Sequence, residues 1–263
     1  MPNSEAVSVP RPVALITGAS AGIGLEFALR LAERGYDVVL VARRGDRLDD
    51  LAARLRGAHA EIRAEAVVAD LAGADAAAQI SAEVAQLGLG IDLLVNNAGF
   101  GTHGHFEALS PERERDEIAV NVTALVALTH AFLPAMLERG RGGVINVAST
   151  AAFQPVPYMA VYAATKAFVR SFSEALHEEV HARGVRVLAL CPGPTATEFF
   201  DTAVAPPRGS IRTVRDVVTT GLRAYDAGRP VVIDGASNKL LIAGSTLVPR
   251  RWATKIAGRI MKP

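Results

Sequence analysis

The alternation of short apolar runs with longer helical stretches limits the possible folds of this sequence more than any other feature. The runs, which are expected to be strands, are residues 13–17, 37–42, 65–69, 92–96, 143–148, 185–190 and 230–233. Residues 23–33, 47–56, 74–87, 112–137, 161–181 and 214–227 have helical spacing instead. Most runs are apolar without alternation, which is typical of strands covered on both faces. The pattern predicts an α/β fold with a doubly wound parallel sheet of about seven strands.

Composition and charge favour one domain spanning residues 1–263. Half of the residues are hydrophobic and the formal net charge is +1, so the charge gives no reason to expect a nucleic-acid partner. The single cysteine, Cys191, cannot form an internal disulfide, which suits a cytoplasmic protein. Residues 1–10 lack the pattern of a signal peptide and are expected to be a loose tail. Since no run of about 18 uninterrupted apolar residues occurs, no membrane span is expected.

A glycine-rich turn follows the first predicted strand. It reads Thr17-Gly18-Ala19-Ser20-Ala21-Gly22-Ile23-Gly24 and leads into a predicted helix. Glycine is needed where a backbone turns tightly or approaches a phosphate, and the start of a helix directs free N–H groups at such a group. Glycines after a strand also occur as plain turns, but the flanking strand and helix favour nucleotide binding.

The residues after the second predicted strand indicate which dinucleotide would bind. NAD sites usually place an acidic residue about 20 residues after the glycines, where it binds the ribose 2′-hydroxyl. This sequence instead reads Ala42-Arg43-Arg44. A guanidinium can bind a 2′-phosphate through two hydrogen bonds, so NADP(H) is the predicted cofactor. The alternative is that Arg43 and Arg44 are ordinary surface arginines.

Tyr162 and Lys166 form the candidate catalytic pair. Their spacing places both side chains on one face of the predicted helix 161–181. A nearby cation favours the phenolate, so we expect Lys166 to lower the pKa of Tyr162 from its usual value of about 10. Because Tyr-x-x-x-Lys is common by chance, its neighbourhood must support the assignment.

Polar or glycine-rich segments follow four of the predicted strands. Besides the glycine-rich turn, they are Asn96-Asn97-Ala98-Gly99, Ser149, and Pro192-Gly193-Pro194-Thr195-Ala196-Thr197. Ligands of open α/β sheets bind at the carboxyl ends of the strands. These segments are therefore predicted to meet at one rim of the sheet, beside Tyr162.

These motifs, together with Asn121, resemble the classical short-chain dehydrogenase/reductase family. The resemblance covers about residues 12–197. It implies a single Rossmann-type domain and an oxidoreductase that moves hydride between a nicotinamide cofactor and a carbonyl or alcohol substrate. The basic residue usual before the second glycine of the turn is Ala21 here. That leaves Arg43, with Ser20 and Arg44, to hold the 2′-phosphate.

The resemblance also implies a role for each matching residue. Tyr162 would be the acid/base, and Ser149 would hydrogen-bond the substrate oxygen. Lys166 would bind the nicotinamide ribose, and Asn121 would position a water in a proton relay. The implied cofactor contacts are Gly18, Ser20, Gly22, Ile23, Gly24, Arg43, Arg44, Asp70, Leu71, Asn97, Ala98, Gly99, Tyr162, Lys166, Pro192, Gly193, Thr195 and Thr197.

The substrate itself is not specified by these motifs. Tyr158 is expected on the same helical side as Tyr162, where it contacts substrate or simply packs. Residues 198–212 are predicted to form a flap, and its apolar Phe199 and Phe200 favour a partly hydrophobic substrate. An epimerase or dehydratase would need a longer C-terminal portion, and a non-catalytic dinucleotide sensor would be expected to lack the catalytic side chains.

Other polar residues are assigned ordinary roles. His103 and His105 are expected to be loop residues, with substrate contact as the alternative. His177 and His181 lie four apart, but two ligands make a weak site, so no metal is predicted. Cys191 is expected to pack as a small apolar residue.

The predicted helices 112–137 and 161–181 carry more apolar positions than one sheet face needs. Val169, Phe172 and Leu176 are examples. In the family that this sequence resembles, these helices form a four-helix dimer interface, so a homo-oligomer is expected. The alternative is that these residues cover the sheet.

The segment 236–263 is basic and lies outside the family motifs. It contains no acidic residue and six basic ones: Lys239, Arg250, Arg251, Lys255, Arg259 and Lys262. Pro249 should divide it into two short helices, the second with an apolar stripe of Trp252, Ile256 and Ile260. We expect this segment to dock beside the substrate site, with the stripe covering the flap. Packing on another subunit, peripheral membrane contact and disorder are the alternatives.

Overall fold

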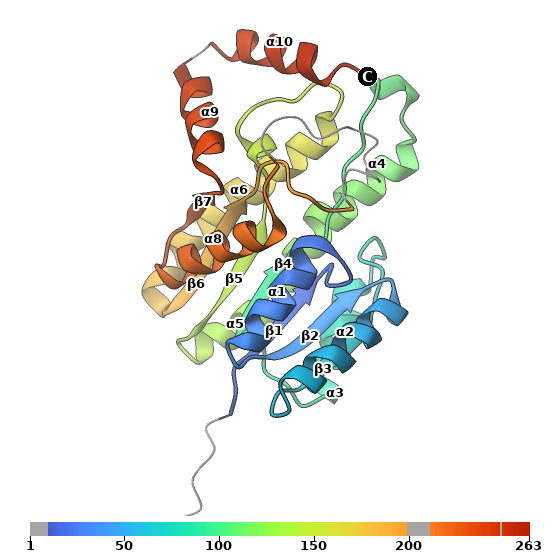
Figure 1. Ribbon diagram of the computed structural model, residues 1–263, viewed down its shortest axis with the longest axis vertical. Helices are drawn as coiled ribbons and strands as arrows, with labels where there is room; N and C mark the ends of the chain where they lie inside the picture. Colours follow the sequence, from blue (N-terminus) through green and yellow to red (C-terminus); the bar gives the residue numbers. More distant parts are fainter. Residues whose placement is uncertain (1–9, 199–210, 248) are drawn as a thin grey trace, which may run out of the picture.

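The computed structural model describes residues 10–198, 211–247 and 249–263 (Figure 1). They contain a seven-stranded sheet in the order β3-β2-β1-β4-β5-β6-β7, with every neighbouring pair parallel. The strands are β1 (Val13–Thr17), β2 (Asp37–Ala42), β3 (Ala64–Val68), β4 (Leu93–Asn96), β5 (Gly142–Val147), β6 (Val185–Cys191) and β7 (Val231–Ile233). The predicted doubly wound fold is confirmed. Most of the predicted tail and flap lies outside the described residues.

Helices cover both faces of this sheet (Figure 1). One face carries α1 (Gly22–Glu33), α2 (Gly45–Ala58) and α8 (Val214–Asp226). The other carries α3 (Ala76–Gln86), α5 (Leu125–Glu138) and α6 (Ala160–Val180). In β1, Ala14 and Ile16 pack into the first core, whereas Leu15 packs into the second. Burial on both sides explains why the strands are apolar without alternation.

The predicted helix 112–137 has an interruption. It consists of α4 (Pro111–Ile118), a π-helical turn (Ala119–Ala124) and α5. Taken together, Pro111–Glu138 is long and apolar enough to cross a membrane, by length and composition only. However, Leu128, Phe132 and Met136 pack in the core beneath the sheet. Packing against the sheet therefore accounts for these three apolar residues of α5.

Two helices end the chain, α9 (Ala236–Leu247) and α10 (Arg250–Met261), with Pro249 between them as predicted. In α10, Ala257 is buried, a Cβ on Gly258 would lie 3.2 Å from Pro157, and the carbonyl of Met261 is 2.7 Å from Nε2 of His103. Small residues let this face approach the body of the protein closely. The stripe predicted to cover the flap is instead exposed, since docking uses the face with Ala257.

Candidate active site

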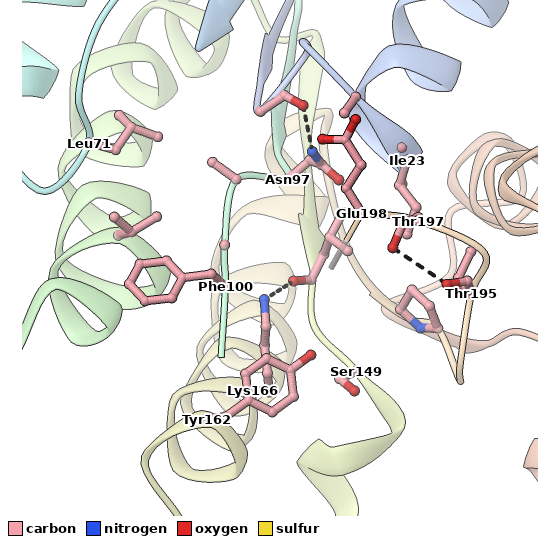
Figure 2. Close-up of a pocket in the computed structure, with 18 of the residues that line it drawn as sticks. Ile23, Leu71, Asn97, Phe100, Ser149, Tyr162, Lys166, Thr195, Thr197 and Glu198 are labelled. Atoms are coloured by element: carbon pink, nitrogen blue, oxygen red, sulfur yellow. Dashed lines mark hydrogen bonds between the residues drawn. The ribbon is translucent and has the colours of Figure 1, made fainter. Parts of the chain in front are cut away.

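A pocket of about 650 Å³ lies along the carboxyl ends of β1, β4, β5 and β6. Its lining includes every predicted cofactor contact except Gly24, together with Ser149. Figure 2 shows Ser149, Tyr162 and Lys166 toward one end of the pocket and Ile23, Asn97 and Glu198 toward the other. Parallel strands therefore bring the predicted residues to one rim.

The glycine-rich turn owes its shape to three glycines. Gly18 and Gly22 have left-handed φ values of +67° and +56°, which side chains rarely adopt. A Cβ on Gly24 would overlap the carbonyl of Gly18 and the side chain of Asn97. Gly24 thus allows close packing beneath the turn and does not itself line the pocket.

Asn97 and Thr17 join this turn to the end of β4. Oγ1 of Thr17 accepts hydrogen bonds from the backbone N–H groups of Asn97 and Ala98, each at 3.0 Å. In return, Nδ2 of Asn97 donates to the carbonyl of Thr17 at 2.9 Å. These bonds fix the two pocket walls relative to each other.

Ser149, Tyr162 and Lys166 meet at the other end of the pocket. Ser149 follows β5, and its side chain hydrogen-bonds with Tyr162. Nζ of Lys166 donates to the carbonyl of Val147 at 2.9 Å and lies 5.8 Å from the centre of the Tyr162 ring. Tyr162 and Lys166 are both buried, so water has little access to either group.

Burial controls the protonation of this pair. It raises the pKa of Tyr162 to about 12, with the Ser149 hydrogen bond opposing the rise. It also lowers the pKa of Lys166 to about 8, and the nearby Glu117 carboxylate opposes that change. The expectation that Lys166 lowers the pKa of Tyr162 is therefore wrong for the protein alone, because desolvation of the phenolate dominates. At neutral pH, Tyr162 is a phenol ready to donate a proton.

Asn121 lies in the π-helical turn and is buried. Its Nδ2 donates to the carbonyl of Phe100 at 2.9 Å and to Oγ1 of Thr165 at 3.0 Å, and its Oδ1 accepts from the N–H of Phe100 at 3.1 Å. The side chain therefore joins the loop after β4 to α6. The structure assigns it this positioning contact, and its role in a water relay stays a prediction.

Basic side chains lie at the opposite end of the pocket, beyond β2. Nε and Nη2 of Arg44 donate to Oγ of Ser20 at 3.2 and 2.9 Å. Nη1 of Arg44 lies 2.9 Å from the Glu198 carboxylate, and Nη1 of Arg47 lies 2.7 Å from it. Hydrogen bonds from Arg47 and Arg44 hold the pKa of Glu198 below its usual range. Arg43 also lines the pocket, but its side chain is exposed. The arginine that Ser20 holds in place is therefore Arg44, because the hydrogen bonds to Ser20 come from Arg44.

A family model described as short chain dehydrogenase matches residues 12–207. The chain belongs to the short-chain dehydrogenase/reductase family. Members of this family are oxidoreductases that use a nicotinamide cofactor. The recognition made from the sequence motifs is confirmed.

Similar proteins extend this comparison beyond the family motifs. The chain is 35% identical over 191 residues to a very-long-chain 3-oxoacyl-CoA reductase of Bos taurus, covering 71% of this chain and 60% of the relative's length. Identity to a protein of the same name from Mycosarcoma maydis is 33% over 252 residues, covering 91% and 70%. A short-chain dehydrogenase from Sphingobium yanoikuyae, solved in complex with NADPH, is 36% identical with a TM-score of 0.81, covering 90% and 94%.

Tyr158 does not have the place in this short-chain dehydrogenase/reductase that the sequence predicted. It precedes α6 and has a left-handed φ of +66°, so it is not on the helical face of Tyr162. Its ring packs edge-on against His105 at 5.1 Å, and it lines a separate cavity of about 230 Å³. The other predicted substrate contacts, Phe199 and Phe200, lie outside the described residues.

Glu117 is a buried acidic residue that the sequence analysis missed. Its Oε2 accepts hydrogen bonds from the N–H and Oγ1 of Thr102, both at 2.9 Å. Its Oε1 is buried and has no hydrogen-bond partner among the described residues. Burial raises the pKa of Glu117, and the Thr102 bonds oppose the rise. Its position four residues before Asn121 was the available signal, because that spacing places both on one helical face.

The remaining candidates keep structural roles. Cys191 is buried at the end of β6, and burial raises the pKa of its thiol to about 12, which fits an unreactive core residue. His177, Glu178 and His181 lie close enough to share a metal ion. However, Nδ1 of His177 pairs with the carbonyl of Val187, and Nδ1 of His181 pairs with that of His177. These contacts engage one nitrogen of each ring in the protein's own hydrogen bonds.

Proposed function

We propose that this protein is an NADP(H)-dependent oxidoreductase for carbonyl or alcohol substrates, with Tyr162 as acid/base. The observation that carries the proposal is the pocket itself. Ser149, with the buried Tyr162 and Lys166, lies toward one end, and the Arg44–Ser20 pair lies beside the glycine-rich turn. Cofactor and substrate would therefore meet in front of Tyr162.

The residues present fit a phosphorylated dinucleotide. Glycines in the turn remove the side chains that would fill the space beside α1, whose start directs free N–H groups at a pyrophosphate. The three residues directly after β2 include no acid, and Arg44 and Arg47 offer guanidinium groups to a 2′-phosphate. NADPH in the related Sphingobium structure supports the same choice.

The proposed chemistry is a balanced transfer of hydride and proton. The bound nicotinamide supplies hydride to the carbonyl carbon in reduction, or accepts it in oxidation. Tyr162 gives its phenol proton to the carbonyl oxygen, which becomes the alcohol, and Ser149 donates a hydrogen bond to that oxygen. Lys166 would bind the ribose hydroxyls, and its charge would stabilise the phenolate left on Tyr162.

An NADPH-oxidation screen tests this function. The panel contains aldehydes, ketones, quinones, steroids and 3-oxoacyl thioesters, the last chosen because two related proteins are 3-oxoacyl-CoA reductases. Apolar residues of the pocket wall such as Phe100, Val120 and Met159 favour the more hydrophobic members. If the protein binds NADPH but oxidises it with no compound in the panel, a dinucleotide sensor would be the better explanation.

Glu198 leads to a prediction about cofactor affinity. Its carboxylate occupies the same guanidinium groups of Arg44 and Arg47 that a 2′-phosphate would use. We expect Glu198→Gln to lower the Kd for NADPH about two- to tenfold, because exposed ion pairs contribute modestly, and to leave the Kd for NADH nearly unchanged. Fluorescence titration measures both constants. Glu138→Gln, at an exposed site on α5, is the matched control. Unchanged or weaker NADPH binding by Glu198→Gln would contradict the idea that the Glu198 carboxylate competes with the 2′-phosphate for these arginines.

The outer faces of α4 and α6 support a homodimer. Val169 and Leu176 are buried against the sheet, so these two were wrongly assigned to an interface. Phe168 and Ile118 are exposed, and Phe168 stacks on Phe172 with ring centres 5.8 Å apart.

We expect a dimeric mass by light scattering at micromolar concentration. Phe168→Glu should shift the protein toward monomer, because it places a charge in an apolar interface. Phe106→Glu, which alters another exposed phenylalanine, is the control. A monomeric parent protein would refute the prediction.

A further inference from the structure

The outward face of α10 is apolar and exposed. Trp252 and Ile256 are each 52% exposed, and Ile260 is 44% exposed. On α9, Leu240 and Leu241 are also exposed. Apolar residues gathered in one stripe, as on α10, mark an interaction site more often than scattered surface residues do.

One side of α10 faces the body of the protein, and the other side does not. At about 100° per residue, Trp252, Ile256 and Ile260 occupy one narrow arc, while Ala257 and Met261 lie on a neighbouring arc that faces the protein. Arg251, Lys255 and Arg259 occupy the arc on the other side of the apolar stripe. The stripe is thus not needed for docking α10 on the body, and a basic row borders it.

Charge narrows the choice of partner. The chain from Asn238 to Pro263 carries six basic residues and no acidic residue. Within α10, the cationic groups of Arg251 and Lys255 lie 5.9 and 5.5 Å from the centre of the Trp252 ring, so charge and apolar surface are adjacent. A second copy joined through this face would bring two such cationic sets together, which is unfavourable. The face therefore favours an anionic partner with an apolar interior.

We propose that α9 and α10 form a peripheral docking surface for an anionic phospholipid bilayer. Trp252, Ile256 and Ile260 would enter the boundary between headgroups and acyl chains, and the basic row would lie at the lipid phosphates. Tryptophan suits this boundary because its ring is apolar and its N–H is polar. Both helices lie at one end of the molecule, away from α2, α3 and β3 (Figure 1).

The experiment uses the full chain and its single tryptophan. Trp252 is the only tryptophan in the sequence, so its fluorescence reports on α10 directly. With vesicles of equal parts phosphatidylcholine and phosphatidylglycerol, the protein should sediment together with the lipid. The fluorescence emission of Trp252 should also shift to shorter wavelength. Vesicles of phosphatidylcholine alone, or high salt with the anionic vesicles, should give much weaker binding, since the attraction is largely electrostatic.

Two sets of variants separate the apolar and electrostatic contributions, and both keep Trp252. The double variant Ile256→Gln, Ile260→Gln removes much of the stripe and should weaken vesicle binding at least about tenfold. The triple variant Arg251→Gln, Lys255→Gln, Arg259→Gln should weaken it roughly 100-fold, because each basic residue contributes about a fivefold gain at an anionic surface. Glutamine is a good helix former, so α10 should persist. NADPH affinity should stay unchanged in both.

A matched charge control shows whether position matters. The triple variant Arg54→Gln, Arg183→Gln, Arg229→Gln changes the net charge equally at exposed sites outside α10. It should bind vesicles almost as well as the parent protein. The proposal would be overturned if this control lost as much vesicle binding as the α10 triple variant. It would also be overturned if the parent protein did not sediment with anionic vesicles. A Trp252 shift that follows protein concentration without lipid would instead assign the face to a second copy.

Discussion

Tyr162→Phe is expected to reduce turnover by about 10²–10⁴-fold while NADPH binding survives. The substitution removes only the phenol oxygen, which hydrogen-bonds Ser149 and would give its proton to the substrate. Lys166 keeps its hydrogen bond to the carbonyl of Val147, so its own position does not depend on that oxygen. Turnover is measured as kcat on the best substrate of the NADPH-oxidation screen, and binding is measured by fluorescence titration.

Tyr158→Phe is the matched control for this experiment. It removes the same atom from a tyrosine four residues earlier, which lines the separate cavity beside His105. Its kcat should stay close to that of the parent protein. Near-normal turnover of Tyr162→Phe would refute the acid/base assignment, whereas a comparable loss in Tyr158→Phe would return that residue to the substrate site.

Arg44→Gln is expected to raise the Kd for NADPH about 10- to 100-fold and to leave the Kd for NADH nearly constant. Hydrogen bonds to charged groups contribute about 1.5–3 kcal/mol, and 1.4 kcal/mol corresponds to a factor of ten. Ser20 holds the Arg44 guanidinium in the pocket wall, so little side-chain freedom is lost when a phosphate binds. Titration with both cofactors measures the preference.

Arg43→Gln is the control that distinguishes the two neighbouring arginines. Arg43 lines the pocket but is exposed, so its loss should weaken NADPH binding less than the loss of Arg44. The reverse order would support the assignment made from sequence, in which Arg43 is the main phosphate ligand. Tighter binding of NADH than of NADPH by the parent protein would refute the NADP(H) preference altogether.

Local chemistry made much of the site predictable from sequence. The glycines at 18 and 22 have left-handed backbone angles that the motif leads one to expect. Strand ends also place Asn97, Ser149 and Pro192 on one rim, because parallel strands share their carboxyl edge. Tyr158 was misplaced because α6 begins at Ala160, and a helical spacing applies only within a helix.

Long-range contacts could not be predicted in the same way. Glu198 meets Arg44 and Arg47 across about 150 residues of sequence, and no local pattern encodes that pairing. The pKa of Tyr162 was predicted in the wrong direction because a sequence shows the lysine nearby but not the burial that raises this pKa.

The sequence by itself determined the succession of strands and helices along the chain, the two-sided core and the family motifs, since each depends on local backbone preference and apolar periodicity. Only the tertiary structure decided which face of α10 docks and which stays exposed. The apolar stripe of Trp252, Ile256 and Ile260 looked like the buried side, yet the small residues around Ala257 fit closer to the loops at His103 and Pro157. Amphipathicity shows that a helix has two faces, but the shape of the surface beneath it selects the one that packs.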